Sequence, residues 1–195
     1  RERVKRASCL NNLKQCGLAL GNYAGDYGDR IPPAFQNQNY LARMDHNLRE
    51  TVLAGMGIVL AEEFIAVKSL GCPSAKATGS LANFELTPAK VKESWEGVNS
   101  SFGAYLYRET YHGCSMKFSD SHVGGAKKDA ILMDYGNKSS TGSISSHGFS
   151  WNNILYRDGH VEGFPNNDTP AAKFTPDWSA GANDAVWNNA DLAAN

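Results

Sequence analysis

The sequence predicts an α+β fold in which a long N-terminal helix packs on an antiparallel β-sheet, with inserted helices and loops. Apolar residues recur at helical intervals near the start, and strand-like runs ending in an Asp-Gly turn occupy residues 101–164. The 195 residues, 42% hydrophobic with a net charge of −1, suit one globular domain over residues 1–195. A chain with a net charge this close to zero does not have the excess of basic residues expected of a protein that binds nucleic acid.

The first expected element is a helix over residues 2–27, within segment 1–27. Its apolar residues follow one another at intervals of three and four, which makes a continuous stripe. Gly17 and Gly21 each cost about 1 kcal/mol relative to Ala, so this helix must gain stability by packing. Gly25 and Pro32 mark its end. The expected packing face consists of Cys9, Leu13, Cys16, Leu20, Tyr23 and Tyr27.

Residues 28–100 form a variable αβ region. The apolar run 47–70 predicts one or two short helices, broken near Gly55 and Gly57. The segment "GCPSAKATGS" (71–80) is expected to be a loop. The C-terminal segment 165–195, rich in Asn, Ala and Asp, is expected to be irregular.

Residues 101–164 are expected to form the antiparallel sheet. "SFGAYLYRETY" and "AILMDY" carry the aromatic and branched residues typical of strands, and "GNKSSTGSISSHG" between sheet segments is typical of a loop. The hairpin at 153–164 is centred on Asp158-Gly159, a strong signal for a two-residue type I′ turn. That turn would place Tyr156 opposite Val161, on the face toward the helix.

The segment "SSHGFSWNNILYRDGHVEGF" is dense in polar residues. The predicted hairpin accounts for most of them as a solvated face, on which charged pairs contribute only about 0.2–1 kcal/mol. His147 stands outside this pattern. We expect His147 either to hydrogen-bond the turn or a strand end, or to be exposed. A metal site joining His147 to Asp158, or a hydrolase centre that adds His160, is the less favoured interpretation.

Four cysteines allow three pairings. Cys9 and Cys16 are seven residues apart on a helix, about 10 Å, which is beyond the reach of a disulfide. The pairing Cys72–Cys114 is favoured because both residues lie outside the helix. No cofactor is expected. A structural calcium ion held by loop carboxylates stays open, although no motif supports one.

Several segments together resemble bacterial prepilin-type proteins, a group related to type II secretion pseudopilins and type IV pilins. They are "RASCLNNLKQCGLALGNYAGDYGDRIPP", "CPSA", "ILMD" and "HGFSWNNILYRDGHVEGF". The group carries a C-terminal signature of His, nine residues and Asp-Gly. Here His147, Asp158 and Gly159 supply it, with ten residues between His147 and Asp158.

This resemblance implies a leader removed by a prepilin peptidase, then a hydrophobic helix that anchors the protein in the inner membrane and later enters a filament core. The basic, uncapped start at Arg1 fits an expectation that the helix continues upstream. The globular part would lie in the periplasm of a Gram-negative-type bacterium. Its partners would be other pilin-like subunits and the secretion machinery, with no nucleic acid and no membrane contact except through the upstream helix.

The predicted function is therefore that of a structural, non-enzymatic subunit of a type II secretion pseudopilus or type IV pilus-like assembly. The alternative is an extracellular or periplasmic module that binds glycans or other surface polymers by ring stacking. That alternative would use exposed aromatic rings, and the sequence offers five candidates: Trp95, Tyr105, Tyr107, Tyr111 and Trp151.

Overall fold

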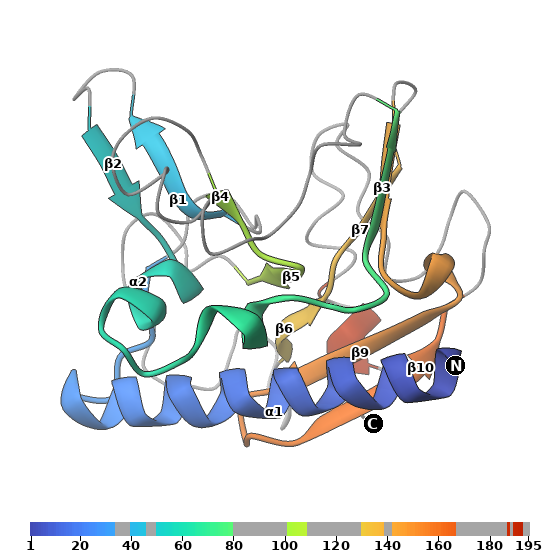
Figure 1. Cartoon of the computed structure of the whole chain (residues 1–195). Helices are drawn as coiled ribbons and strands as arrows, with labels where there is room; N and C mark the ends of the chain where they lie inside the picture. The colour runs from blue at the N-terminus through green and yellow to red at the C-terminus, as the bar shows by residue number, and fades with distance from the viewer. Residues whose placement is uncertain are drawn as a thin grey trace.

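The structure is a computed structural model that describes residues 1–33, 40–45, 50–79, 101–108, 130–138, 142–166, 187 and 189–192. It confirms the α+β class. Helix α1 (Glu2–Asp26) runs along one side of a four-stranded antiparallel sheet, an arrangement consistent with a pilin-like fold (Figure 1). None of the described helices is long and apolar enough to cross a bilayer.

The central sheet has the strand order β10-β9-β6-β5, and every neighbouring pair is antiparallel. The helix contacts β9, β10 and β6 of this sheet. Cross-strand pairs such as Leu132 with Leu155 and Leu106 with Met133 set the register. The four strands are β5 (Tyr105–Tyr107), β6 (Ala130–Asp134), β9 (Trp151–Tyr156) and β10 (Val161–Pro165).

Two smaller antiparallel sheets extend away from α1 at opposite ends of the molecule (Figure 1). One has the order β2-β1-β4 and the other β3-β8-β7. Two short helices connect the first small sheet to the second. The remaining elements are β1 (Tyr40–Asp45), β2 (Glu50–Leu53), α2 (Met56–Ala61), η1 (Val67–Leu70), β3 (Lys76–Gly79), β4 (Ser101–Phe102), β7 (Gly136–Lys138), β8 (Gly142–Ser145) and η3 (His147–Phe149).

The buried face of α1 lies where the helical spacing placed it, except at its C-terminal end. Cys9, Leu13, Cys16, Leu20 and Tyr23 are all buried. Tyr27 was also expected there, and that expectation is wrong: α1 ends at Asp26, and Tyr27 is 42% exposed. Its ring instead stacks on Tyr23 from outside, with ring centroids 4.2 Å apart.

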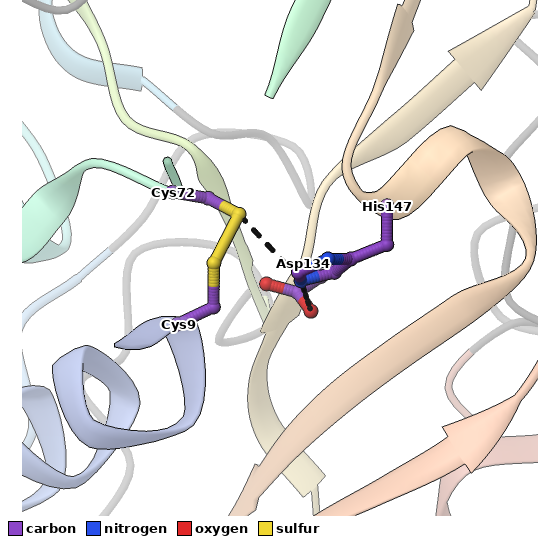
Figure 2. A group of neighbouring side chains, drawn as sticks. All are labelled: Cys9, Cys72, Asp134 and His147. Carbon is purple, nitrogen blue, oxygen red and sulfur yellow. Dashed lines mark hydrogen bonds and ion pairs between the residues drawn. A yellow bond between two sulfur atoms is a disulfide. The ribbon is translucent and has the colours of Figure 1, made fainter. Parts of the chain in front are cut away.

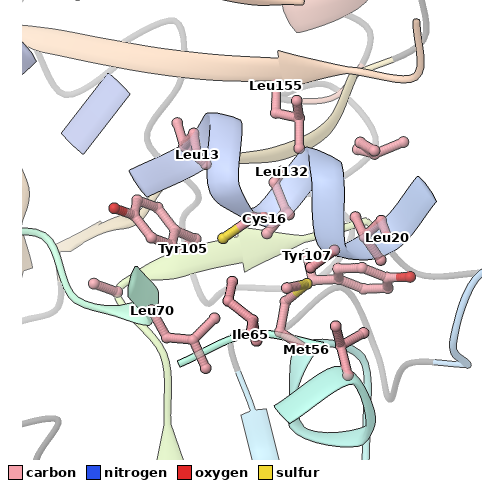
Figure 3. Packing of buried hydrophobic residues seen from close by; sticks show 14 of the residues in the cluster. Leu13, Cys16, Leu20, Met56, Ile65, Leu70, Tyr105, Tyr107, Leu132 and Leu155 are labelled. Carbon is pink, nitrogen blue, oxygen red and sulfur yellow. The ribbon is translucent and has the colours of Figure 1, made fainter. Parts of the chain in front are cut away.

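The sheet separates two apolar clusters. The larger cluster lies between α1, the sheet, α2 and η1, and includes Leu132 and Leu155 (Figure 3). The other covers the opposite face of the sheet around Trp187. Asp191 accepts two hydrogen bonds from the Arg108 guanidinium, each 3.0 Å long, and one from the backbone N–H of Ala130. These contacts fix the last described segment against the sheet.

The hairpin between β9 and β10 has a different register from the predicted one. Leu155, not Tyr156, pairs with Val161, and the Tyr156 N–H donates to the His160 carbonyl, so three residues rather than two form the loop. Within this loop only Gly159 has a left-handed φ, of 84°, as expected for a three-residue loop ending in a bulge. The Asp158 side chain stabilises this loop by accepting a hydrogen bond from the His160 N–H, 3.1 Å.

The changed register exchanges the two faces of the hairpin. Leu155 and Val161 pack with the cluster under α1, whereas Ile154 and Tyr156 pack with Trp187 on the far side. Tyr156 was predicted to face the helix, and that prediction is wrong because the pairing differs by one residue.

Three local predictions also fail. The first part of the apolar run 47–70 is strand β2, although α2 and η1 supply the short helices expected after it. The segments 71–80 and 136–148 were expected to be loops, yet they contribute the paired strands β3, β7 and β8. Within 165–195, expected to be irregular, residues 187 and 189–192 are helical. In each case strand pairing or tertiary packing outweighs local propensity.

Candidate functional site

A cluster of polar and sulfur-containing side chains lies beside the N-terminal half of α1, inside the molecule (Figure 2). Cys9 comes from α1, Cys72 from the segment after η1, Asp134 from the end of β6, and His147 from η3. All four are buried, with one potential ligand atom of each within 4.8 Å of the others. We call these four residues the Cys-Asp-His cluster.

The two cysteines of this cluster form a disulfide, and their Cα atoms are 5.2 Å apart. The expected pairing Cys72–Cys114 is therefore wrong. The helix brings Cys9 against the segment after η1, and no sequence spacing could show that proximity; Cys114 lies outside the described residues. The Cys9–Cys72 disulfide spans a sequence separation of 63. It joins α1 covalently to the segment after η1.

Asp134 is the acidic member of the cluster and is 1% exposed. The backbone N–H and the side-chain amide of Asn153, on the neighbouring strand β9, both donate hydrogen bonds to its Oδ2, at 2.9 and 2.8 Å. Its other oxygen, Oδ1, is buried and has no hydrogen-bond partner in the part of the chain that the structure describes. A carboxylate oxygen left unsatisfied inside a protein is costly, so it calls for a physical explanation.

His147 enters the cluster from a turn with unusual backbone geometry. His147, Gly148 and Phe149 have φ values of 52°, 61° and 60°, so three successive residues adopt the left-handed conformation. Such a conformation costs of order 1–3 kcal/mol at a non-glycine residue and concentrates at functional sites. The turn buries the His147 ring, with Nε2 3.3 Å from Asp134 Oδ2 and 3.7 Å from Cys72 Sγ.

Glu2, in the first turn of α1, completes the surroundings of the imidazole. Its Oε1 lies 2.8 Å from His147 Nδ1 and also accepts a hydrogen bond from the Ser74 hydroxyl. The hydrogen bond to His147 is the main reason that the pKa of Glu2 is lowered. Burial alone would lower the pKa of His147, but hydrogen bonds and charges of Asp134 and Glu2 outweigh it and raise that pKa. In the disulfide form the His147 ring therefore lies between two carboxylates, with Nδ1 facing Glu2 and Nε2 facing Asp134.

The other members of the family signature do not join this cluster. Asp158 and Gly159 form the tip of the hairpin, and His160 Nδ1 lies 3.1 Å from Asp158 Oδ1 near the surface. His160 also stacks on Tyr156, with ring centroids 4.6 Å apart. The structure thus does not bring His147, Asp158 and His160 to one metal or hydrolase centre. His147 instead hydrogen-bonds groups at a strand end and in the helix.

Sequence reasoning missed Glu2, Asp134 and Asn153. Asp134 did carry a signal, because it is the single charged residue at the end of the apolar run "AILMD", whose residues are all buried. A carboxylate in such a strand is rarely without a partner. Glu2 and Asn153 carried no comparable signal, since their roles depend on the tertiary contact between α1, η3 and β9.

The opposite face of α1 is a second candidate site, of a different kind. Val4 and Leu18 are 69% and 65% exposed, and Gly21 and Gly25 lie on the same outward side. Among the described residues, a Cβ atom added at Gly21 or Gly25 would meet nothing within 4 Å. The packing of that part of the chain therefore gives no reason for these glycines. We call Val4, Leu18, Gly21 and Gly25 the outer face of α1.

The aromatic residues considered for polymer binding do not form an exposed platform in the described part of the chain. Tyr105 and Tyr107 are buried, and their hydroxyls donate to the carbonyls of Gly71 and Pro32. Trp151 is partly buried, with the Arg6 guanidinium 4.6 Å from its ring centroid. Trp95 and Tyr111 lie outside the described residues.

Residues 1–51 match the SBP_bac_10 family, described as "Protein of unknown function (DUF1559)". That family is associated with prepilin-like proteins, and the matched segment contains α1. No curated protein and no solved structure matches the chain. The match and the fold together make a pilin-like structural role plausible.

Proposed function

We propose that the protein is a structural subunit of a type II secretion pseudopilus or a type IV pilus-like filament, located on the periplasmic side of the inner membrane. In this proposal it acts by packing against other subunits and performs no catalysis. The observation that supports it best is the division of α1 into two faces. One face is buried in the protein's own core, and the other presents Val4 and Leu18 to solvent.

The glycines strengthen this interpretation. Gly21 and Gly25 each destabilise a helix by about 1 kcal/mol relative to Ala, yet a Cβ atom at either position would meet none of the described residues within 4 Å. A neighbouring helix can approach closely where such small residues lie. An apolar side chain exposed beside them would then be buried in the subunit contact.

The Cys9–Cys72 disulfide fits the same proposal. Disulfides persist in oxidising compartments, which include the bacterial periplasm. The Cys9–Cys72 disulfide joins α1 to the segment after η1. It would keep the globular part attached to α1 when α1 is packed against neighbouring subunits.

The proposal is tested by placing a charge on the outer face of α1. We expect Leu18→Asp, made in the full-length protein in its producing cells, to abolish co-purification with other copies or assembly partners, because burying an unpaired carboxylate is strongly unfavourable. The folded monomer should be unaffected, since Leu18 is exposed. Ala66→Asp is the matched control, because Ala66 is exposed and lies off this helix. Assembly of Leu18→Asp at the wild-type level would contradict the proposal.

A further inference from the structure

We infer that the Cys-Asp-His cluster is a zinc-binding site when Cys9 and Cys72 are reduced. The ligands would be the two sulfurs, Nε2 of His147 and the carboxylate of Asp134. This inference is independent of the proposed filament role. It concerns a site whose disulfide form, shown in Figure 2, is one of two states.

The donor set matches what zinc prefers. Zn²⁺ is bound by Cys sulfur, His nitrogen and Asp oxygen, and its structural sites are closed, four-coordinate and tetrahedral. All four donor residues are buried here, and none is more than 7% exposed. A bound ion would therefore have four protein ligands in a site closed to solvent.

The distances also suit a tetrahedral ion. Zinc bond lengths of about 2.3 Å to sulfur and about 2.1 Å to nitrogen or oxygen imply ligand-to-ligand separations of about 3.6 Å for sulfur–nitrogen and about 3.4 Å for nitrogen–oxygen. The observed values are 3.7 Å from Cys72 Sγ to His147 Nε2 and 3.3 Å from His147 Nε2 to Asp134 Oδ2. The two sulfurs, now bonded, would have to separate to about 3.8 Å, and all donor atoms already lie within 4.8 Å of one another.

Two features around the donors point to a ligand. Asp134 Oδ1 is buried without a hydrogen-bond partner among the described residues, and Asn153 holds Oδ2 by two hydrogen bonds, so the carboxylate is fixed in position and has a free oxygen that a cation would help to satisfy. Glu2 lies 2.8 Å from His147 Nδ1. A carboxylate that accepts the Nδ1–H leaves Nε2 as the ligating atom, as in the carboxylate–histidine–zinc arrangements of known sites.

A dithiol reductant supplies two electrons and two protons, which break the Cys9–Cys72 bond and give two thiols, while the reductant becomes a cyclic disulfide. Binding of Zn²⁺ by the two sulfurs then releases both thiol protons to solvent. In the oxidised state the disulfide links α1 to the segment after η1, and in the reduced state the ion would link the same two segments. The ion would also link α1 to β6 and η3, through Asp134 and His147.

The test uses the whole chain, reduced by a dithiol without oxygen and then titrated with Co²⁺, a spectroscopic substitute for Zn²⁺. We expect one ion per chain, tetrahedral d–d bands and a thiolate-to-cobalt charge-transfer band, all displaced by Zn²⁺. The oxidised protein should show none of these. His147→Asn should remove the tetrahedral spectrum, whereas His160→Asn and Cys114→Ser should leave it unchanged.

Glu2→Gln is the second test variant, because a substitution at a buried ligand such as His147 can prevent folding. Its side chain is 46% exposed, so this variant should fold. We expect its affinity for Zn²⁺, measured by competition with a chromophoric chelator, to fall about 10- to 100-fold, as for other partners of ligating histidines. Lack of stoichiometric binding by the reduced wild type, or wild-type affinity in Glu2→Gln, would overturn the inference.

Discussion

The two faces of α1 differ in what the rest of the chain does with them. On the inner face, Gly17 lies so close to β9 that an added Cβ would be 2.9 Å from Leu155 Cδ1. On the outer face, one turn later, a Cβ at Gly21 would meet none of the described residues within 4 Å. Packing against Leu155 thus favours glycine at position 17, whereas no contact in the described part of the chain explains the glycine at position 21. That difference separates residues that hold the fold from residues available for assembly.

The largest expected effect on the inner face comes from the disulfide. Cys9→Ser removes a cross-link with a sequence separation of 63, which should lower the free energy of unfolding by about 4 kcal/mol. Urea denaturation under non-reducing conditions measures it. Cys16→Ser is a useful comparison, because Cys16 is on the same face but forms no disulfide. A loss below about 1 kcal/mol in Cys9→Ser would show that the cross-link does not hold α1 in place.

Two leucines of α1 give a matched pair. Leu20 is fully buried, so Leu20→Ala should destabilise the protein by about 2–5 kcal/mol through lost burial and the cavity left behind. Leu18 is 65% exposed, and Leu18→Ala should change stability by less than about 0.5 kcal/mol. Thermal or urea unfolding of the two variants side by side tests this difference. Equal losses would mean that the faces are wrongly assigned.

Replacing Gly17 or Gly21 by Ala should change the free energy of unfolding least, but in opposite directions. Gly17→Ala should destabilise by up to about 2 kcal/mol, because displacing Leu155 from a packed core costs about 1–3 kcal/mol and the gain in helix propensity offsets about 1 kcal/mol of that. Gly21→Ala should stabilise the isolated domain by about 0.5–1 kcal/mol through helix propensity. If Gly21→Ala also weakens assembly, the outer glycines serve close approach of a neighbour. If both variants change stability in the same direction, the comparison between the faces fails.

The sequence was sufficient for α1 because helical periodicity is local information. It predicted residues 2–27, and α1 spans Glu2–Asp26; the error falls at Tyr27, one residue beyond the helix. The cysteine pairing required knowledge of which distant segments meet. Spacing eliminated Cys9–Cys16, but it could not reveal that Cys72 lies beside Cys9.

In the β9–β10 hairpin, an error of one residue in the predicted register places side chains on the wrong face of the sheet. Asp158-Gly159 correctly indicated a turn, yet the Asp158 side chain supports a three-residue loop by capping the His160 N–H. One extra loop residue moved Tyr156 from the helix side of the sheet to the Trp187 side. His147 could not be assigned from sequence, because Glu2, Asp134 and Cys72, which surround it, come from three other segments.

The most direct test of the central claim is the accessibility of the outer face of α1 before and after assembly. Leu18→Cys, in a Cys114→Ser background, is labelled with a maleimide. Cys16 should not react with the maleimide, because its side chain is buried and burial raises the pKa of its thiol from 9.0 to about 12. We predict rapid labelling of the dispersed protein and at least tenfold slower labelling in the assembled form, whereas a Cys placed at Ala66 labels equally in both. Equal labelling of Leu18→Cys in the two forms would contradict the account.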